Sequence, residues 1–310
     1  MIKIACVGDN VVDINYVDRM INPGGNCVNV AAYAAQLGHD VAYVGILADD
    51  RYADILTESF QKLNIKYDQC PVLHGETGRC FCDLIDGDRK LGDENDGGLV
   101  KSDPLQIVGD LIEYLQGFDI VHTSCYSYID DQLHVFHEYN IPVVYDFSTK
   151  WNADNIMEIC SHVDYVLFSM KDEAPMTEAE EEAMLAAVTD KTDCKVAILT
   201  KGTAGAVISD GTRIYRKEPY NVSGGAIDTT GCGDSWIAGF ITTYVEGLKR
   251  LNILKETACG NFTVPDNEKD YLENLIQISM CMGNLKARHT SQIKGGYGYG
   301  KSIEDFEAGK

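Results

Sequence analysis

The sequence predicts an α/β fold in which a mostly parallel central sheet carries helices on both faces. Apolar runs typical of buried strands alternate with amphipathic stretches typical of helices along most of the 310 residues. Strands are expected at 2–8, 41–47, 120–122, 143–147, 165–168 and 196–200, with intervening helices that include 29–37, 52–63 and 130–139. Such alternation favours parallel strands, because a helical crossover returns the chain to the same end of the sheet.

Two segments interrupt this alternation and predict a second, smaller unit. Residues 11–22 continue past the first strand without a helix. Residues 77–96 form a predicted hairpin whose turn is Asp86-Gly87, with Cys80, Cys82 and Leu84 on one face. We expect 11–22 and 77–96 to form a β-lid beside a core made of 1–10, 23–76 and 97–310.

The remaining segments complete the expected organisation. A further hairpin over 206–217 turns at Asp210-Gly211. The four glutamates of 178–182 indicate a solvated helix face. Residues 255–270 are polar and irregular, so we interpret them as an insertion of unknown purpose ahead of an apolar helix over 271–285.

Composition narrows the classes of function. The 26 Lys and Arg against 48 Asp and Glu give a net charge of −22, which disfavours nucleic-acid and membrane partners. No stretch approaches the roughly 18 apolar residues of a membrane span, and the N-terminus lacks a signal-peptide pattern. The 11 cysteines are scattered and odd in number, which favours reduced thiols without a disulfide or zinc site. We expect a cytoplasmic protein.

A helix is predicted to begin at a run of small residues, Gly231-Cys232-Gly233, directly before Asp234. The helical period follows in Trp236, Ile237, Phe240, Ile241 and Tyr244. Free backbone amides and the helix dipole favour an anion at such a terminus. A carboxylate is costly there unless it performs chemistry, for example by accepting a hydroxyl proton. The alternative, that Asp234 is an ordinary N-cap, is equally compatible with the helix pattern.

A second cluster of small and polar residues lies near the N-terminus, in Pro23–Ala31. Gly24 and Gly25 allow the backbone to approach a ligand, and Asn29 offers both a donor and an acceptor to a polyol. Asp13 follows the first strand, near the sheet end where α/β proteins place ligands. Taken alone, the Gly-Gly-Asn pattern is explained better by a glycine turn with an Asn early in a helix.

Together these two segments resemble the two signatures of the ribokinase-like, or pfkB, carbohydrate kinases, and the resemblance covers nearly the whole chain. Residues 228–234 are similar to the family pattern D-x-x-G-[AC]-G-D, and Pro23–Ala31 to the N-terminal signature. The resemblance implies a three-layer α/β/α sandwich and ATP-dependent phosphorylation of a sugar hydroxyl. It makes Asp234 the catalytic base and the amides of Gly231, Cys232 and Gly233 the anion hole.

The same resemblance assigns the other binding residues. Substrate contacts are implied at Asp13, Gly24, Gly25, Asn29, Arg79 and Asp146. Nucleotide contacts are implied at Thr200, Gly202 and Gly205, in a loop similar to T-x-G-x-x-G, and at Asn284. Glu173 would place Mg²⁺ through water, although Met170 stands where the family has Asn, and Asp228 would lie near a monovalent cation such as K⁺.

Shorter blocks resemble one branch of the family, the fructoselysine 6-kinases. They lie at 8–13, 24–31, 88–93, 119–122 and 145–151, the last reading Tyr-Asp-Phe-Ser-Thr-Lys-Trp. This implies phosphorylation at O6 of a sugar attached to an amino acid. The excess of acids in the lid suggests that they hold the ammonium of such an adduct, and solvated hairpin residues explain the same count at least as well; these acids are Asp83, Asp86, Asp88, Asp93, Glu94 and Asp96. A fructokinase, another ketose or nucleoside kinase, and a non-catalytic sugar-binding regulator stay open. A dimer through the lid is also implied by some relatives.

The C-terminal segment 295–302 fits the P-loop pattern G-x-x-x-x-G-K-S, but its context contradicts that interpretation. A P-loop follows a buried strand and opens a long helix, whereas 290–294 is polar and only eight residues follow Ser302. His134 and His137 are expected to be surface residues without a metal role.

Overall fold

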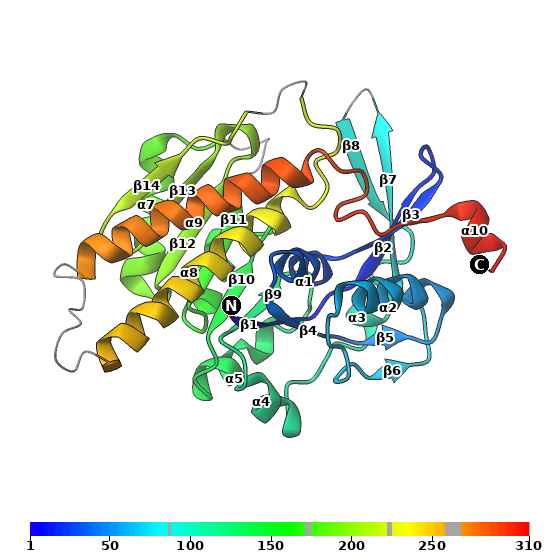
Figure 1. Cartoon of the computed structure of the whole chain (residues 1–310), viewed down its shortest axis with the longest axis horizontal. Helices are drawn as coiled ribbons and strands as arrows, with labels where there is room; N and C mark the ends of the chain where they lie inside the picture. Colours follow the sequence, from blue (N-terminus) through cyan, green and yellow to red (C-terminus); the bar gives the residue numbers. More distant parts are fainter. Residues whose placement is uncertain (86–87, 171–174, 222–224, 258–267, 310) are drawn as a thin grey trace.

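The computed structural model describes residues 1–85, 88–170, 175–221, 225–257 and 268–309, without the side chains of 82–91, 93 and 153–154. Its main feature is an eight-stranded sheet in the order β14-β13-β12-β11-β10-β9-β1-β4 (Figure 1). The strands, in that order, are Ile214–Lys217, Ala206–Ser209, Val196–Thr200, Tyr165–Ser169, Val143–Asp146, Ile120–Ser124, Lys3–Val7 and Asp40–Val44. In the order of the sheet, the strands from β12 through β11, β10, β9 and β1 to β4 are parallel. Strand β13 is antiparallel to β12 and forms a hairpin with β14, and this arrangement confirms the predicted sheet.

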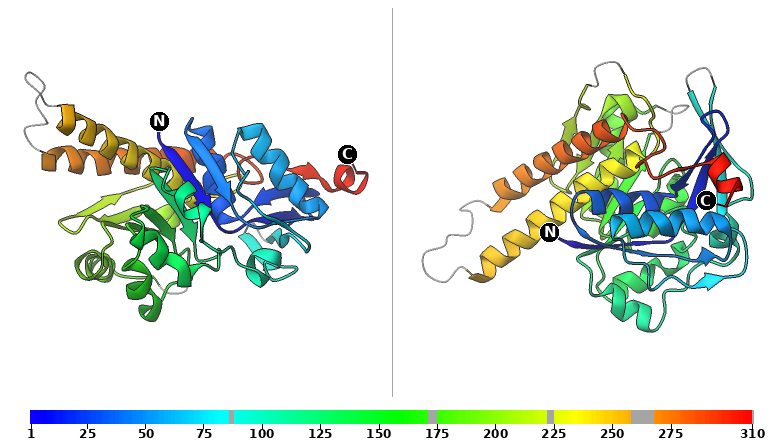
Figure 2. Two further views of the ribbon diagram at one scale, coloured as in Figure 1. Left: turned by 90° about the horizontal axis from the view of Figure 1, so that it is seen from below. Right: turned by 45° about the vertical axis from the view of Figure 1, so that its right-hand side comes forward.

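Helices cover both faces of this sheet, as the left view of Figure 2 shows. Side chains alternate along each strand, so Ile4 and Cys6 join one core cluster while Ala5 and Val7 join the other. The first cluster includes α1 (Asn26–Gln36), α2 (Arg51–Leu63), α8 (Cys232–Thr257) and α9 (Glu268–Thr290). The second includes α4 (Asp110–Leu115), α5 (Leu133–Glu138), α6 (Ala153–Cys160) and α7 (Glu178–Lys191). The three-layer α/β/α prediction is confirmed.

A second sheet of five strands lies beside the first, in the order β15-β3-β2-β7-β8. Its strands are Lys301–Ser302, Met20–Gly24, Val11–Asn15, Gly78–Ile85 and Asp88–Asp93. Both segments that we expected in the lid therefore supply strands to this sheet. Strand β15 was not expected, because its two residues are too short to give a strand pattern.

The short elements join these layers. They are β5 (Leu47–Ala48), β6 (Val72–Leu73), α3 (Gly98–Ser102), η1 (Asp130–Gln132), η2 (Gly202–Ala204) and α10 (Ile303–Glu307). No helix in the described ranges combines the length and apolarity that a membrane crossing requires.

The structure corrects the interpretation of 255–270 as irregular. Helix α8 extends to Thr257 and α9 begins at Glu268, so both ends of this stretch are helical. Residues 258–267 lie outside the described residues.

The P-loop look-alike has another role in the structure. Lys301 pairs with Glu58 at 3.0 Å, and the Ser302 hydroxyl accepts a hydrogen bond from the Asp305 amide to cap α10. That helix has only five residues, which agrees with the rejection of a P-loop.

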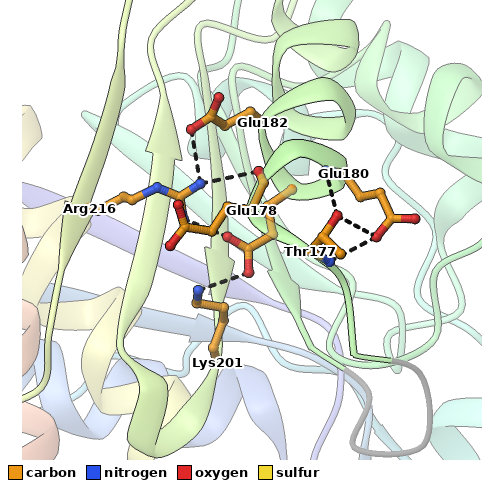
Figure 3. A network of polar contacts seen from close by, with 7 residues as sticks. Thr177, Glu178, Glu180, Glu182, Lys201 and Arg216 are labelled. Carbon is orange, nitrogen blue, oxygen red and sulfur yellow. Dashed lines mark hydrogen bonds and ion pairs between the residues drawn. The ribbon is translucent and has the colours of Figure 1, made fainter.

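The structure also corrects the interpretation of the glutamates in 178–182 as a solvated helix face, because one of them is buried at the start of α7. Glu181 is only 2% exposed. One of its carboxylate oxygens lies 2.8 Å from Lys201 Nζ and the other 2.5 Å from Arg216 Nη1. Arg216 also reaches Glu182 at 3.0 Å (Figure 3). Because the two cations come from β14 and from the loop after β12, Glu181 ties α7 to both.

Candidate active site

A cavity of about 640 Å³ opens where the carboxyl ends of the central parallel strands meet the second sheet. The N-termini of α1 and α8 also contribute to its wall. The lining residues are Asp9, Asn10, Val11, Asp13, Gly25, Asn26, Asn29, Cys80, Gly92, Gly97, Val100, Tyr126, Tyr128, Asp146, Ser148, Lys150, Ser169, Thr229, Thr230, Gly231, Gly233 and Asp234. Parallel α/β sheets commonly bind ligands at this end.

Asp234 lies in the first turn of α8 and faces this cavity together with Asp13 and Asn29. Its two carboxylate oxygens accept hydrogen bonds from Asn26 Nδ2 at 2.8 Å and Asn29 Nδ2 at 2.7 Å. Since α8 begins at Cys232, Asp234 is inside the helix and not the cap residue before it. This position disfavours the ordinary N-cap interpretation.

The surroundings of Asp234 make its charged form costly. Burial in the cavity wall, followed by the neighbouring carboxylate of Asp146, raises its pKa well above the usual range. Asp9 and Asp13 raise it further, and the hydrogen bond from Asn29 opposes them. A raised carboxyl pKa brings the group closer to the range in which a general base works well.

The turn before Asp234 requires small residues for two different reasons. Gly231 has φ +69°, and a Cβ there would lie 2.3 Å from the Tyr33 hydroxyl oxygen. A Cβ on Gly233 would meet no atom within 4 Å, so this position leaves space for a ligand. Cys232 points its thiol at the Ala287 carbonyl, 3.6 Å away, and can offer the cavity only its backbone. The first amides of a helix lack intrahelical acceptors and favour an anion.

Helix α1 receives its N-terminal cap from a different strand. Gly25 has no side chain to cap the helix, and Asp9, at the end of β1, accepts hydrogen bonds from the amides of Asn26 at 2.6 Å and Cys27 at 3.2 Å. Asp9 is 4% exposed and also accepts a hydrogen bond from the Ser124 hydroxyl at 2.9 Å. Through this capping, Asp9 holds Asn26 and Asn29 in place beside Asp234.

The glycine pair at 24 and 25 lets β2, β3 and α1 approach closely. A Cβ on Gly24 would lie 2.8 Å from a carboxylate oxygen of Asp13. Gly25 has φ +102°, and a Cβ there would lie 2.9 Å from the Cα of Asn10. Gly25 lines the cavity, whereas Gly24 acts through the space that it leaves for Asp13.

Asp146 ends β10 and forms another acidic part of the wall. It is 3% exposed and accepts hydrogen bonds from the Ser148 amide at 2.7 Å and from Asn26 Nδ2 at 2.8 Å. Burial raises the pKa of Asp146 to about 6, with a further contribution from Asp9. The cavity thus holds four carboxylates, on Asp9, Asp13, Asp146 and Asp234.

One cation faces these acids. Among the described residues that line the cavity, Lys150 is the single lysine or arginine. Its Nζ lies 4.1 Å from the ring centre of Tyr126, whose hydroxyl donates to Ser148 Oγ at 3.0 Å. The cavity is therefore strongly acidic but has one positively charged point.

The structure does not bring Arg79 into this cavity. Cys80 lines the cavity, and neighbouring residues of a strand point to opposite faces. The Arg79 guanidinium instead lies 3.4 Å from Glu76, 3.5 Å from Glu94 and over the Tyr52 ring. A role for Arg79 in holding the second sheet explains these contacts better than a direct contact to substrate.

The lid acids that the structure describes are also engaged elsewhere. Glu94 meets Arg79 and accepts a hydrogen bond from the Tyr16 hydroxyl, and Asp96 pairs with Lys101. Asp86 lies outside the described residues, as do the side chains of Asp83, Asp88 and Asp93. The acids that reach the cavity come instead from β2 and from the ends of the central strands.

The expected nucleotide loop follows β12 next to this cavity. Thr200 Oγ1 lies 3.4 Å from Ser169 Oγ, and Ser169 lines the cavity. Gly202 has φ +53°, with open space where a Cβ would lie. Gly205 has φ +88°, and a Cβ there would lie 2.2 Å from the Lys217 carbonyl oxygen.

Asn284 is placed differently, inside the packing of the two long helices. It is 4% exposed and accepts a hydrogen bond from Trp236 Nε1 at 2.8 Å. Its amide donates to the Glu218 carbonyl at 2.6 Å. These contacts join α9 to α8 and to the chain after β14.

Two acids, Glu173 and Asp228, were expected near bound cations, and the structure describes only Asp228. Glu173 lies outside the described residues, and Met170 packs half-buried against the second core cluster, where its thioether is a poor ligand for Mg²⁺. Asp228 accepts hydrogen bonds from the amides of Thr230 and Gly295, each at 2.9 Å. In the part of the chain that the structure describes, no group of three His, Cys, Asp or Glu is arranged to hold a metal.

Sequence reasoning missed three residues that the geometry brings forward. Asn26 lies between the signature residues and was overlooked beside Asn29. Asp9 precedes Asp13 in the same block, and only the packing of α1 reveals its capping role. Lys150 was noted within the block 145–151, but nothing in its spacing showed that it reaches the cavity.

Comparison with known proteins agrees with this fold and shows the family. The model of the pfkB family carbohydrate kinases matches residues 1–264. The fructosamine kinase FrlD of Bacillus subtilis is 35% identical over 243 residues, which cover 78% of this chain and 83% of that protein. The fructoselysine 6-kinase of Escherichia coli is 29% identical over 265 residues, covering 85% and 98%.

Solved structures agree on the architecture. The ribokinase of Arabidopsis thaliana, complexed with ribose and ATP, superposes with a TM-score of 0.73 at 17% identity, covering 99% of this chain and 98% of that one. The ribokinase of Giardia lamblia has the same TM-score, identity and coverage. At this identity the likeness shows the fold alone, and the family match carries the assignment. The chain therefore belongs to the pfkB family of carbohydrate kinases, enzymes that phosphorylate sugars with ATP.

Proposed function

We propose that this kinase phosphorylates O6 of fructoselysine or of a related sugar–amino acid adduct. The observation that carries the proposal is the composition of the cavity, in which Asp234 shares one space with Asp13, Asn29, Asp146 and Lys150. The names of the relatives, fructosamine kinase and fructoselysine 6-kinase, support the same class of substrate.

In the proposed reaction, Asp234 takes the proton of the sugar hydroxyl as that oxygen attacks the terminal phosphorus of ATP. A new O6–phosphorus bond forms, the bond to the ADP oxygen breaks, and the proton moves to the Asp234 carboxylate. The amides of Gly231, Cys232 and Gly233 face the negative charge on the transferring group. Asp13 and Asn29 orient the sugar by hydrogen bonds to its hydroxyls.

The nucleotide is assigned to the neighbouring loop of Thr200, Gly202 and Gly205. The space above Gly202 and the contact between Thr200 and Ser169 support this placement. Mg²⁺, when bound, would neutralise phosphate oxygens, with Glu173 reaching it through water. A K⁺ ion near Asp228 belongs to the same proposal.

The second sheet is proposed to act as a lid that excludes water during transfer. It contributes Val11, Asp13, Cys80 and Gly92 to the cavity wall, so a bound sugar would contact it directly. We also propose a cytoplasmic enzyme that can dimerise through this sheet.

The charges of the cavity suit a zwitterionic substrate. Carboxylates on Asp9, Asp13 and Asp146 attract the amine of a sugar–amino acid adduct. Lys150 offers a partner for the carboxylate of the amino acid, because within the described part of the chain its Nζ lies over the neutral Tyr126 ring. A neutral ketose such as fructose would use neither charge.

The test is a comparison of kcat/KM for fructoselysine and fructose in an ADP-release assay at fixed ATP. The proposal predicts a preference for fructoselysine of at least about a hundredfold, because a site built for polar groups discriminates strongly against a substrate that lacks them. Equal values or a preference for fructose would support the fructokinase alternative. Absence of turnover with all sugars, together with sugar binding, would support a non-catalytic regulator.

A further inference from the structure

The side chain of Asn26 lies between two acids of the cavity. Its Nδ2 is 2.8 Å from Asp234 Oδ1 and 2.8 Å from Asp146 Oδ2. Both amide hydrogens are needed for these two bonds, because ionised carboxylates only accept. In the opposite orientation, the Asn26 oxygen would face two negatively charged groups. The function of Asp234 therefore depends on which way this amide points.

His122 is the group that contacts the other end of the Asn26 amide. Its Nε2 lies 2.7 Å from Asn26 Oδ1. Since this oxygen can only accept, Nε2 must carry the hydrogen, which fixes the tautomer of the ring. An Asn26 rotated by half a turn would present its NH₂ to Nε2, and the ring would then have to carry its hydrogen on Nδ1, which is buried and has no partner within the described residues. The ring thus disfavours the wrong orientation.

His122 occupies a position where an apolar residue would be the ordinary choice. It lies within β9, is 0% exposed and follows the apolar pair Ile120 and Val121. Burial lowers its pKa to about 3, so the ring is neutral in the physiological range. Within the described residues its Nδ1 has no hydrogen-bond partner. A buried, half-satisfied imidazole is unfavourable for stability, which suggests that the Nε2 hydrogen is retained for another reason.

We propose that His122 is a positioning residue for Asp234, acting through Asn26. The ring N–H holds the Asn26 oxygen, so that both amide hydrogens point at the carboxylates of Asp146 and Asp234. The proposal rests on the assignment of Asp234 as the base.

The consequence is a change in the pH dependence of the reaction. Asp234 faces charged groups from several elements, namely Asp9 after β1, Asp13 on β2 and Asp146 on β10, with the neutral Tyr33 on α1 nearby. Burial and these acids raise its pKa, and the hydrogen bond from Asn29 counteracts them. The hydrogen bond from the Asn26 side chain also favours the charged carboxylate. If Asn26 turned its oxygen toward the acids, the pKa of Asp234 would rise further. The bond from Asn29 would remain, so the deprotonated base would still work.

The experiment compares His122→Leu with His122→Gln. Leucine fills the space without a donor, whereas the Gln amide can donate from near the position of Nε2. The readout is the pH profile of kcat/KM for the sugar, which reports ionisations of the free enzyme. For His122→Leu we expect the acid limb to move up by about one pH unit, the equivalent of one charge-assisted hydrogen bond. At high pH, kcat/KM of His122→Leu should stay within about twofold of wild type. In His122→Gln the acid limb should return to its wild-type position.

Two results would overturn the inference. One is an acid limb of His122→Leu that coincides with that of wild type. The other is an equal loss of plateau activity in both variants, since a purely structural role predicts no pH shift and no rescue by Gln. These outcomes are separate from a failure of the proposed function, because a fully active Asp234→Asn enzyme would remove the base assignment whatever His122 does.

A measurement on the wild-type enzyme covers the case in which His122→Leu does not fold. Nitrogen-15 NMR of labelled histidine distinguishes the two neutral tautomers. We expect His122 to hold its hydrogen on Nε2 and not to titrate between pH 5 and 9. A hydrogen on Nδ1, or protonation within that range, would contradict the arrangement.

Discussion

The buried glutamate Glu181 gives a quantitative prediction for stability. In Glu181→Leu the side chain keeps similar bulk but loses the bonds to Lys201 and Arg216. Hydrogen bonds to charged groups contribute about 1.5–3 kcal/mol each. Burying leucine returns roughly 1.5–3 kcal/mol, and Lys201 and Arg216, 17% and 30% exposed, can turn to water. The expected net loss is about 1–3 kcal/mol.

Urea unfolding of the two proteins measures this loss, with Glu182→Leu as the matched control. Glu182 lies next in the chain and also meets Arg216, but it is 49% exposed. Its replacement should change stability by less than about 0.5 kcal/mol. Equal losses in the two variants, or a more stable Glu181→Leu protein, would refute the reasoning that the buried pair stabilises the fold.

The difference in unfolding free energy between wild type and Glu181→Leu should also depend on pH. Burial alone would raise the pKa of Glu181, but hydrogen bonds from Arg216 and Lys201 outweigh it and lower the pKa below its ordinary 4.5. A lowered pKa stabilises the folded state at pH values above 4.5, and this contribution is lost as the pH falls through the folded pKa. The gap between wild type and Glu181→Leu should therefore narrow below about pH 4.5.

Three further predictions concern activity. The pKa of Asp234 is raised by burial and by Asp146, so kcat/KM should fall on the acid side with a limb well above the ordinary carboxyl range, as a pH–rate profile will show. An acid limb near the pKa of a solvated aspartate would contradict this. Lys150→Met should raise KM for fructoselysine about tenfold, the equivalent of 1.4 kcal/mol, and leave KM for an adduct without the carboxylate unchanged. Equal effects on both substrates would remove the assigned contact. Lys301→Ala should keep kcat within about twofold, because Lys301 pairs with Glu58 outside the cavity, whereas a P-loop lysine would be indispensable.

The fold could be predicted from the sequence because its elements carry strong local patterns. The central strands are uninterrupted apolar runs, and the turn pair Asp210-Gly211 predicts the hairpin at 206–217. The family resemblance, confirmed by the match over 1–264, rests on two signatures that are local in sequence. Elements that depend on distant contacts were missed, since β15 is a strand only because it pairs with Met20 and Ile21.

The site was predicted where residues act through their own motif, and not where tertiary contacts decide. Asp13, Asn29, Asp146 and Asp234 were expected from the signatures, and the structure brings them into one cavity. Arg79 was expected there too, but strand alternation directs it to the opposite face of the second sheet. The charge count of 178–182 could not show that Glu181 would be buried, because its partners are separated by 20 and 35 residues. The catalytic and binding roles themselves stay predictions.

The central claim is that the carboxylate of Asp234 accepts the proton of the sugar hydroxyl, and Asp234→Asn tests it most directly. The substitution removes one of four neighbouring carboxylates but sets an NH₂ group against Nδ2 of Asn26 or Asn29, so its two effects on stability oppose each other. A melting curve of the variant therefore accompanies the assay and shows that the enzyme is folded. With fructoselysine and ATP, we predict a kcat lower by about 10²–10⁴-fold with little change in KM. A folded Asp234→Asn enzyme with a kcat near that of wild type would contradict the account.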